Sequence, residues 1–396
     1  MKNLFVSLTL LLMSISAFGQ QALWGDTPII SPEIHDDKTV TFRLKAPEFT
    51  SVQVTGDFLP PQKIETQFGE FDGPGVADLV EKNGVWEYTT PEPLTPELYS
   101  YSFLVDGLKI NDPNNVYLIR DVASVTNVFL IDGERADLYK VNKVPHGTVS
   151  KVWYNSSILD MDRRMTVYTP AGYESSKKRY PVFYLLHGMG GDENAWSELG
   201  RTTQILDNLI AQSKAEPMIV VMTNGNAALE AAPGESSLGF TPPNMQLPRT
   251  MEGSFETAFP EIINYIDTHY RTIQNKHHRA IAGLSMGGYH SLHISKEYPD
   301  LFDYVGLFSA AIMPGKNVKS PVYEDFEGKL KVQFAKTPHL YWIAIGDKDF
   351  LYQDNVDFRK MLDENGYKYE YFETEEGHIW KNWRIYLTEF VPKLFK

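Results

Sequence analysis

The 396-residue sequence contains no cysteine. This absence excludes disulfide bonds, thiolate nucleophiles, zinc–thiolate sites and lipid attachment through an N-terminal cysteine. Basic residues are few: 37 Lys and Arg stand against 51 Asp and Glu, which gives a formal net charge of −14. A chain of this sign repels phosphate backbones and anionic lipid, so nucleic acid is not an expected partner. The sequence has no internal repeat and no low-complexity tract.

One apolar run stands out, and it lies at the start of the chain. Lys2 precedes the run Leu4–Leu12, and Ala17 and Gly19 place small residues where a signal peptidase reads them. The run is well below the roughly 20 residues that a membrane-spanning helix needs. Residues 1–19 are therefore predicted to be a cleavable signal peptide. The mature protein is expected in the periplasm or outside the cell, not as a lipoprotein and without a membrane span.

The length predicts two or three domains, and residues 26–135 are predicted to form an all-β, immunoglobulin-like sandwich. Short runs of period two, separated by turn residues, are typical of its strands. These runs are Thr39–Leu44, Ser51–Thr55, Gly84–Thr90, Leu98–Val105 and Ser124–Ile131. Asp106-Gly107 predicts a hairpin, because both central residues of a type I′ turn need positive φ. The stretch between Pro60 and Lys82 is rich in Gly, Pro and acidic residues and shows no apolar periodicity, which predicts a long loop at the sandwich edge.

After a linker at residues 136–148, the pattern in residues 149–396 changes to apolar strands that alternate with helix-length amphipathic segments. The expected strands are Tyr180–Leu186, Met218–Met222, Ala280–Leu284, Tyr304–Ser309 and His339–Ile345. The expected helices are Glu193–Lys214, Ser254–Tyr270, Met286–Tyr298, Gln353–Asn365 and Trp380–Leu394. Such alternation predicts a mostly parallel sheet with helices on both faces.

A candidate nucleophile, Ser285, lies where one of these strands turns into a helix. The stretch from Gly283 to Gly287 reads G-x-S-x-G, and Gly288 follows. This context makes the motif meaningful, because the serine of an α/β-hydrolase fold sits on a tight, strained strand-to-helix turn with no room for neighbouring side chains. The start of the helix also offers free N–H groups and a partial positive charge to a developing oxyanion.

The second half of an oxyanion hole is predicted at the end of another strand, in the run Leu186–Gly191. Glycines there allow backbone N–H groups to approach a substrate carbonyl closely. The N–H of Met189, or that of Gly188, is expected to act together with the N–H of Met286. The run lacks the spacing and the lysine of a phosphate-binding loop.

The base and the acid follow from chain order, which in this fold is serine, acid, histidine. His378 is the only histidine after Leu340, and it precedes the last expected helix, so it is the predicted base. The acid is expected after the strand His339–Ile345, where Asp347 and Asp349 are both available. Asp349 is preferred because the loop must pass the strand end before it reaches the base.

No metal or cofactor is predicted. His290 and His293 lie one helical turn apart, with Glu297 nearby, but the sequence has no H-E-x-x-H and helix faces carry such pairs by chance.

Several motifs together resemble carbohydrate esterase family 1, which includes the feruloyl and acetyl xylan esterases and is related to siderophore esterases and esterase D. They are the elbow Gly283–Gly288, the run Leu186–Trp196, the acid loop Gly346–Leu351, and Gly377-His378 with Trp380. In that family the acid is followed by a small or apolar residue and a leucine, which favours Asp349. The resemblance implies hydrolysis of hydroxycinnamoyl (feruloyl) or acetyl esters on plant cell-wall polysaccharide such as arabinoxylan. Candidate substrate-binding residues are His187, Gly188, Trp196, Asn224 and Trp380.

The N-terminal part looks like a glycogen-binding-type sandwich module of family 48. Its sugar-stacking tryptophans are not identifiable, and Trp86 is interpreted as a core residue, so this part is expected either to bind polysaccharide or to shape the cleft. Two alternatives to the main hypothesis remain. One is a catecholate siderophore trilactone esterase, against which the export signal argues. The other is a carbohydrate-binding protein with an inactive hydrolase scaffold.

Overall fold

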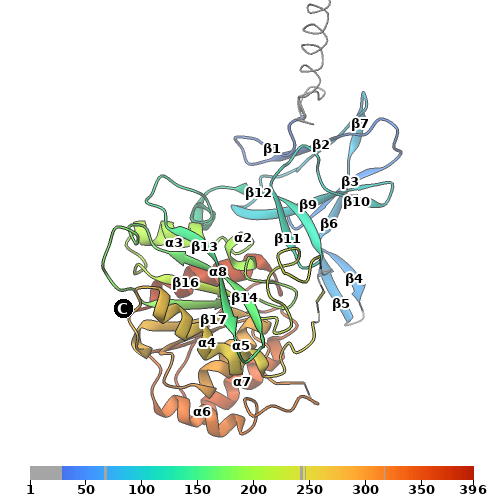
Figure 1. Ribbon diagram of the computed structural model, residues 1–396. Helices are drawn as coiled ribbons and strands as arrows, with labels where there is room; N and C mark the ends of the chain where they lie inside the picture. The colour runs from blue at the N-terminus through green and yellow to red at the C-terminus, as the bar shows by residue number, and fades with distance from the viewer. Residues whose placement is uncertain (1–28, 67–68, 241–243, 246, 316) are drawn as a thin grey trace, which may run out of the picture.

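The computed structural model describes residues 29–396 except 67–68, 241–243, 246 and 316. The predicted signal peptide therefore lies outside the described residues. The chain forms an all-β N-terminal region, here residues 29–133, and an α/β C-terminal region, here residues 148–396 (Figure 1). None of the helices described is long and apolar enough to cross a membrane.

Two antiparallel sheets make up most of the N-terminal region. The first has the order β1-β2-β8-β7, with β1 (Glu33–Ile34), β2 (Val40–Lys45), β8 (Val85–Thr89) and β7 (Val80–Lys82). The second has the order β11-β12-β9-β3-β6, with β11 (Leu118–Asp121), β12 (Ser124–Ile131), β9 (Glu97–Val105), β3 (Val52–Gly56) and β6 (Gly75–Asp78), and β10 (Leu108–Ile110) pairs with β9. The predicted strands of this region are confirmed with small shifts at their ends.

Side chains from both sheets bury an aromatic core. Phe42 and Phe103 are fully buried within it, and Trp86 packs against its edge as predicted. Asp106 and Gly107 have φ angles of 46° and 84° and join β9 to β10, as their sequence predicts. Alternation of apolar residues thus located the strands that face this core.

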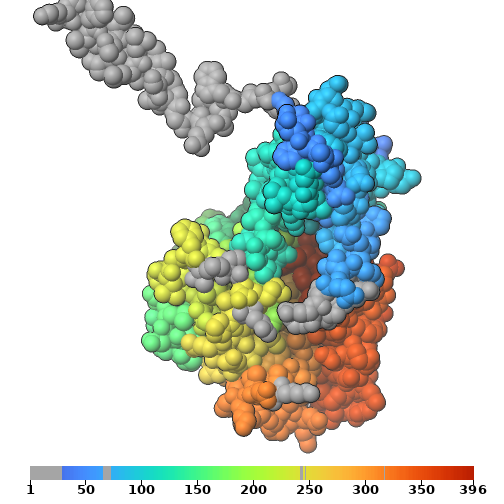
Figure 2. Space-filling view, turned by 90° about the vertical axis from the view of Figure 1, so that its right-hand side faces the viewer, coloured from blue at the N-terminus to red at the C-terminus, as the bar shows by residue number. Residues whose placement is uncertain are grey.

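The prediction of a long loop between Pro60 and Lys82 is wrong. This stretch contains β4 (Gln62–Thr66) and β5 (Gly69–Gly73), which pair only with each other, as well as β6 and β7. Because this hairpin lies outside the two main sheets, it was not constrained to the period of two that a strand with one face on a core shows. In both views the hairpin extends from the N-terminal region along the C-terminal region (Figures 1 and 2).

An eight-stranded sheet forms the centre of the C-terminal region, with the order β13-β14-β16-β15-β17-β18-β19-β20. The strands are β13 (Thr148–Ser156), β14 (Met161–Thr169), β15 (Val182–Leu186), β16 (Ile219–Thr223), β17 (Arg279–Leu284), β18 (Tyr304–Phe308), β19 (Leu340–Gly346) and β20 (Glu370–Thr374). β13, β14 and β16 pair antiparallel, and the other neighbours are parallel. The sheet is therefore mixed, with the predicted parallel strands in place and an unpredicted antiparallel edge. Buried charges at Arg163 and Arg164 in β14 conceal its strand pattern.

Helices cover both faces of this sheet. They are α2 (Ala195–Glu198), α3 (Thr202–Ala211), α4 (Ser254–His269), α5 (Met286–Glu297), α6 (Phe326–Ala335), α7 (Tyr352–Glu364) and α8 (Trp380–Phe390), with short 3-10 turns η2 (Glu134–Leu138), η3 (Lys276–His278) and η4 (Val391–Lys393). Successive side chains of β15 alternate between two cores, one shared with α3 and α8 and the other with α4 to α7. This two-layer burial explains why the strands are continuously apolar.

The two regions share one of these cores. Leu98 and Val128 of the N-terminal region are buried in the same cluster as the side chains of α3 and α8. The guanidinium of Arg384 in α8 donates to the Glu97 carboxylate at 3.0 Å and to the Leu98 carbonyl at 3.0 Å. Figure 2 shows a hollow between the regions, bordered by the N-terminal region, with red atoms from the end of the chain inside it.

Candidate active site

The predicted site residues converge at one edge of the C-terminal sheet. His187 follows β15, Ser285 follows β17, Asp349 follows β19 and His378 follows β20, and these strands lie in one parallel array. Because the carboxyl ends of parallel strands share an edge, the side chains that follow them face a common crevice.

Ser285 occupies a strained turn at this edge. Its φ and ψ angles are 52° and −113°, outside the regions that a non-glycine residue prefers. The turn is held because the Ser285 N–H donates to the Phe308 carbonyl at 2.9 Å. A Cβ at Gly287 would lie 2.2 Å from the Leu186 carbonyl oxygen, so no larger residue fits there. Met286 begins α5, and the first N–H groups of a helix have no acceptor within it.

The structure brings His378 and Asp349 together. The Nδ1 atom of His378 lies 2.8 Å from Oδ2 of Asp349, whose side chain is fully buried. With Nδ1 donating to this carboxylate, Nε2 of His378 is left as the proton-accepting atom that a general base needs. Asp347 is exposed, and its backbone N–H donates to the Thr374 carbonyl at 2.9 Å. The geometry therefore favours Asp349 over Asp347 as the acid.

Aromatic rings flank the His378 imidazole. The Phe350 ring centroid is 4.6 Å away and the Trp383 centroid is 4.9 Å away, with Trp383 edge-on. Trp383 is buried, whereas 59% of the Phe350 surface is exposed. One ring therefore fixes the imidazole from within, and the other presents an apolar face beside it.

The segment of residues 188–194, here called the oxyanion loop after its predicted role, lies against Ser285. A Cβ at Gly188 would lie 3.3 Å from Cβ of Ser285. The Gly188 carbonyl accepts hydrogen bonds from His187 Nδ1 at 2.7 Å and from the Gly191 N–H at 3.1 Å. Because a trans peptide is planar, the N–H of Met189 points away from these donors. This orientation suits the role of oxyanion donor that the sequence predicts for Met189.

His187 holds this loop from behind. Its Nε2 accepts the Gly225 N–H at 2.8 Å, so Nδ1 carries the proton that it donates to Gly188. Burial lowers the pKa of His187 to about 4, which keeps the ring neutral. Both ring nitrogens are engaged and the side chain is 1% exposed, so His187 supports the loop and does not face a substrate.

The other predicted substrate-binding side chains differ in accessibility. Trp196 is buried and donates its indole N–H to the Leu186 carbonyl at 2.9 Å. Asn224 is buried and donates to Glu193 at 3.0 Å. Trp380 is partly exposed and packs edge-on against Trp196, with their centroids 5.4 Å apart. Trp196 and Asn224 thus lie in the wall of the site, and Trp380 reaches its surface.

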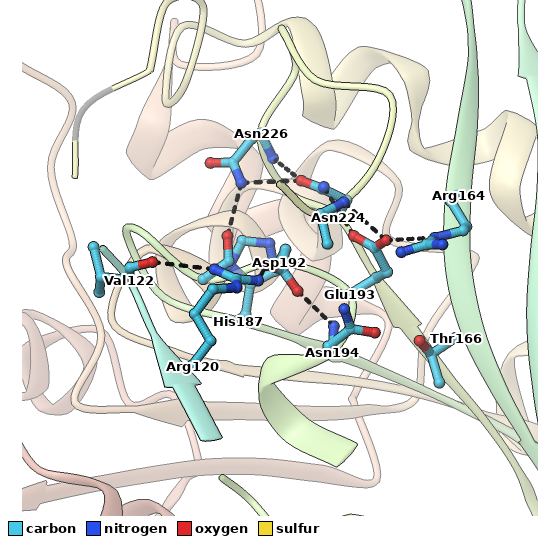
Figure 3. A network of polar contacts seen from close by, with 12 residues as sticks. Arg120, Val122, Arg164, Thr166, His187, Asp192, Glu193, Asn194, Asn224 and Asn226 are labelled. Carbon is cyan, nitrogen blue, oxygen red and sulfur yellow. Dashed lines mark hydrogen bonds and ion pairs between the residues drawn. The ribbon is translucent and has the colours of Figure 1, made fainter. Parts of the chain in front are cut away.

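A network of polar contacts lies behind the oxyanion loop, and no sequence motif predicted it (Figure 3). Glu193 is fully buried and accepts hydrogen bonds from Arg164 Nε at 2.7 Å and from the Ala232 N–H at 3.0 Å. Asn226 donates to the Gly191 carbonyl at 2.8 Å. The only sequence signal for this network is the pair of acidic residues directly after the glycine run. In the sequence, these residues cannot be distinguished from charged residues of a solvent-exposed loop.

No group of three or more His, Asp or Glu side chains that could hold a metal ion occurs among the residues described. His290 and His293 are both buried in α5. His290 pairs with Glu256 at 2.8 Å, and His293 lies 3.1 Å from the Ile312 carbonyl.

The family model named Esterase matches residues 156–394, more than half of the chain. Among curated proteins, the chain is 29% identical over 371 residues to an endo-1,4-beta-xylanase/feruloyl esterase of Xylanibacter ruminicola. The alignment covers 92% of this chain and 46% of that protein. The chain spans less than half the length of the first curated relatives that it matches.

Solved structures share this fold. A CE1 ferulic acid esterase from Anaeromyces mucronatus, in complex with ferulic acid, aligns with a TM-score of 0.54 and 28% identity over 65% of this chain and 93% of that chain. The enterobactin esterase FES of Shigella flexneri aligns with a TM-score of 0.59 and 16% identity over 89% of this chain and 92% of that chain. The second likeness is one of fold alone, and it extends into the N-terminal region.

Proposed function

The chain belongs to the Esterase family, and on this premise we propose that it is a serine esterase acting on hydroxycinnamoyl or acetyl esters of plant cell-wall polysaccharide. The observation that carries the proposal is the 2.8 Å contact between His378 Nδ1 and a buried Asp349, at the sheet edge that also holds the strained Ser285. The names of two relatives, a xylanase/feruloyl esterase and a ferulic acid esterase, support the choice of ester.

In the proposed mechanism, the Ser285 hydroxyl attacks the ester carbonyl while Nε2 of His378 takes its proton. The Asp349 carboxylate stabilises the imidazolium that forms. The N–H groups of Met189 and Met286 bind the oxyanion of the tetrahedral intermediate. His378 then protonates the departing sugar alkoxide, which leaves an acyl-enzyme on Ser285. Water, deprotonated by His378, attacks this acyl group and releases the free acid.

The exposed ring of Phe350 supports an aromatic acyl group. This ring lies beside the imidazole of His378, where the acyl or alcohol part of an ester would pass. An aromatic acyl group beside the rings of Phe350 and His378 gains burial that acetate lacks. We therefore rank hydroxycinnamate above acetate as the acid released.

Export is part of the proposal. The signal at residues 1–19 predicts cleavage after Gly19, and a polysaccharide ester is met outside the cytoplasm. The mass of the protein recovered from a bacterial host tests this point, because cleavage gives a chain that begins at Gln20. A full-length chain retained in the cytoplasm would contradict it.

Hydrolysis rates for three substrates test the function: methyl ferulate, 4-nitrophenyl acetate and a catecholate trilactone. We expect kcat/KM to be highest for methyl ferulate, and ferulate to be released from arabinoxylan. The matched control is Ser285→Ala, which should leave the fold intact. A preference for the trilactone would replace the substrate assignment, and no turnover of any ester would refute the esterase proposal.

A further inference from the structure

A hairpin turn of the N-terminal region reaches the candidate active site. β11 and β12 are joined by a two-residue loop, with Asp121 paired to Ser124 in the register. The turn Arg120–Ala123, here called the docking turn, contacts the oxyanion loop of the C-terminal region through Arg120 and Val122. Figure 3 shows Arg120 between Val122 and Asp192. No sequence motif marks these residues.

Val122 adopts a backbone conformation that costs free energy. Its φ is 52°, which is rare for a β-branched residue. The first central residue of a two-residue hairpin loop with positive φ is normally glycine. The valine side chain instead covers Gly190, where an added Cβ would lie 2.6 Å and 2.7 Å from the two Val122 methyl carbons. Strain that persists at such a position points to a function for the side chain.

Arg120 adds an ionic contact to the same loop. Its Nη2 forms an ion pair with Oδ2 of Asp192, a residue that is 3% exposed, and its Nη1 donates to the Val122 carbonyl at 3.1 Å. The other carboxylate oxygen of Asp192 accepts the Asn194 N–H at 2.9 Å, which closes the end of the oxyanion loop. Without Arg120, Asp192 would be a buried charge with no cationic partner in this contact, a costly state that rearrangement of the loop relieves.

Asp121, between these two residues, touches the other side of the site. Its carboxylate lies close to the side chain of Trp380, two positions after His378. Burial raises the pKa of Asp121, and the Trp380 and Arg120 contacts oppose this shift. The three consecutive residues 120–122 of the N-terminal region therefore lie against both the oxyanion loop and the segment that carries His378 and Trp380.

We propose that the docking turn is a working part of the active site, with Arg120 as a positioning residue. Arg120 and Val122 hold the oxyanion loop in the conformation that directs the Met189 N–H toward the reacting carbonyl. Arg120 acts through Asp192 and does not contact the substrate. The proposal rests on the proposed function only in requiring ester hydrolysis at Ser285, and it is independent of which acid is released.

Steady-state kinetics with 4-nitrophenyl acetate test the role of Arg120, because this small ester does not require polysaccharide contacts. In Arg120→Ala we expect kcat to fall about 10–100-fold while KM changes less than about 3-fold, as for lost transition-state stabilisation. Arg120→Lys keeps the positive charge and should recover most of the rate. A loss confined to KM, or a change in kcat below about 2-fold in Arg120→Ala, would overturn the proposal.

Arg135→Ala is the matched control. Arg135 also joins the N-terminal half of the chain to α8, through Glu389 and Thr388 at 2.8 Å each, but near the far end of that helix from His378. We expect its kcat to stay within about 2-fold of wild type. An equal loss in both alanine variants would show a general effect of domain contacts and overturn the specific role of Arg120.

Val122→Gly separates positioning from stability. Glycine relieves the strain at φ 52°, so the melting temperature should stay the same or rise, whereas kcat should fall because Gly190 loses its cover. A fall in kcat with a lower melting temperature, or an unchanged kcat, would remove Val122 from the proposal.

Amide hydrogen exchange gives a readout that does not depend on activity. Residues 187–196 should exchange faster in Arg120→Ala than in Arg135→Ala. If the wild-type chain hydrolyses no ester, the proposed function fails, and this measurement still decides whether the docking turn holds the loop. Equal exchange in the two variants would overturn that part.

Discussion

The predicted acid–base side and the predicted oxyanion side of the site are supported by different parts of the chain. His378 and Asp349 lie on neighbouring loops of the C-terminal region, and the rings that contact His378, those of Phe350 and Trp383, come from the same region. The oxyanion loop is held from within by His187 and from outside by Arg120 of the N-terminal region.

Under the proposed mechanism, this difference predicts which steps of the reaction depend on the N-terminal region. The proposed proton transfer needs His378 and Asp349, and these residues are brought together by the loops after two neighbouring strands of one sheet. Oxyanion binding needs a glycine-rich loop, which has little stiffness of its own and gains rigidity from whatever packs on it. On this reasoning, the proposal makes the N-terminal region, which packs on that loop, part of the catalytic geometry.

The largest expected effect concerns Ser285, the proposed nucleophile, and His378, the proposed base. Ser285→Ala and His378→Ala should each lose about 10³–10⁶ in kcat, because these residues act as a unit. Circular dichroism and melting temperature check that the fold is retained. Either variant with more than about a tenth of wild-type activity would contradict the assignment.

The next effect distinguishes the two acids. Asp349→Asn should lower kcat by about 10²–10⁴, since it removes the charge beside Nδ1 of His378 and disturbs the tautomer. Asp347→Asn is the matched control, with an exposed side chain, and its effect should be mild. The reverse order would assign the acid to Asp347 and separate the observed pair from catalysis.

Sequence was sufficient for the elements that a periodic apolar pattern or a local steric rule determines. The elbow at Ser285 could be recognised because strand, turn and helix are consecutive and each glycine fills a steric requirement. The apolar strands β15 to β19 were predicted for the same reason, since both faces of each strand are buried. Asp349 needed a further argument, because two carboxylates lie within three residues of one another.

Tertiary contacts between distant segments could not be predicted. Arg120 and Asp192 are 72 residues apart, and in the sequence each is one charged residue among many. The hairpin of β4 and β5 lies outside the main sheets, and β14 carries Arg163 and Arg164 among its buried residues, so neither shows a regular apolar pattern. Such features depend on partners that the local sequence does not contain.

A contact between the regions that includes no residue of the oxyanion loop sharpens the comparison. Glu97 and Arg384 form a buried pair at 3.0 Å, with side chains 6% and 4% exposed. Glu97→Ala should lower the free energy of unfolding by about 3 kcal/mol, because it removes one partner of a buried ion pair. Its kcat at room temperature should stay near that of wild type.

Urea unfolding and ester turnover of Glu97→Ala check this expectation side by side with Arg120→Ala. Stability should fall more in Glu97→Ala, and kcat should fall more in Arg120→Ala. If the two properties instead fall in parallel across both variants, contact between the regions as a whole, and not the docking turn, supports the site.

The smallest expected effect concerns the support that the oxyanion loop receives from within the C-terminal region. Burial lowers the pKa of His187 to about 4, so between that value and the ordinary histidine pKa the unfolded chain binds a proton that the folded chain does not. Stability therefore falls as the pH falls through this window. Between about pH 7 and about pH 5, His187 alone should account for about 2 kcal/mol of the loss.

In His187→Gln, the amide can still donate to Gly188 and accept from Gly225, but it does not titrate. Urea unfolding at the two pH values should then show a shallower loss for His187→Gln than for wild type, with the other titrating groups common to both. An identical loss in the two proteins would mean that His187 is not held neutral by its two backbone contacts, and the internal support of the loop would have to lie elsewhere.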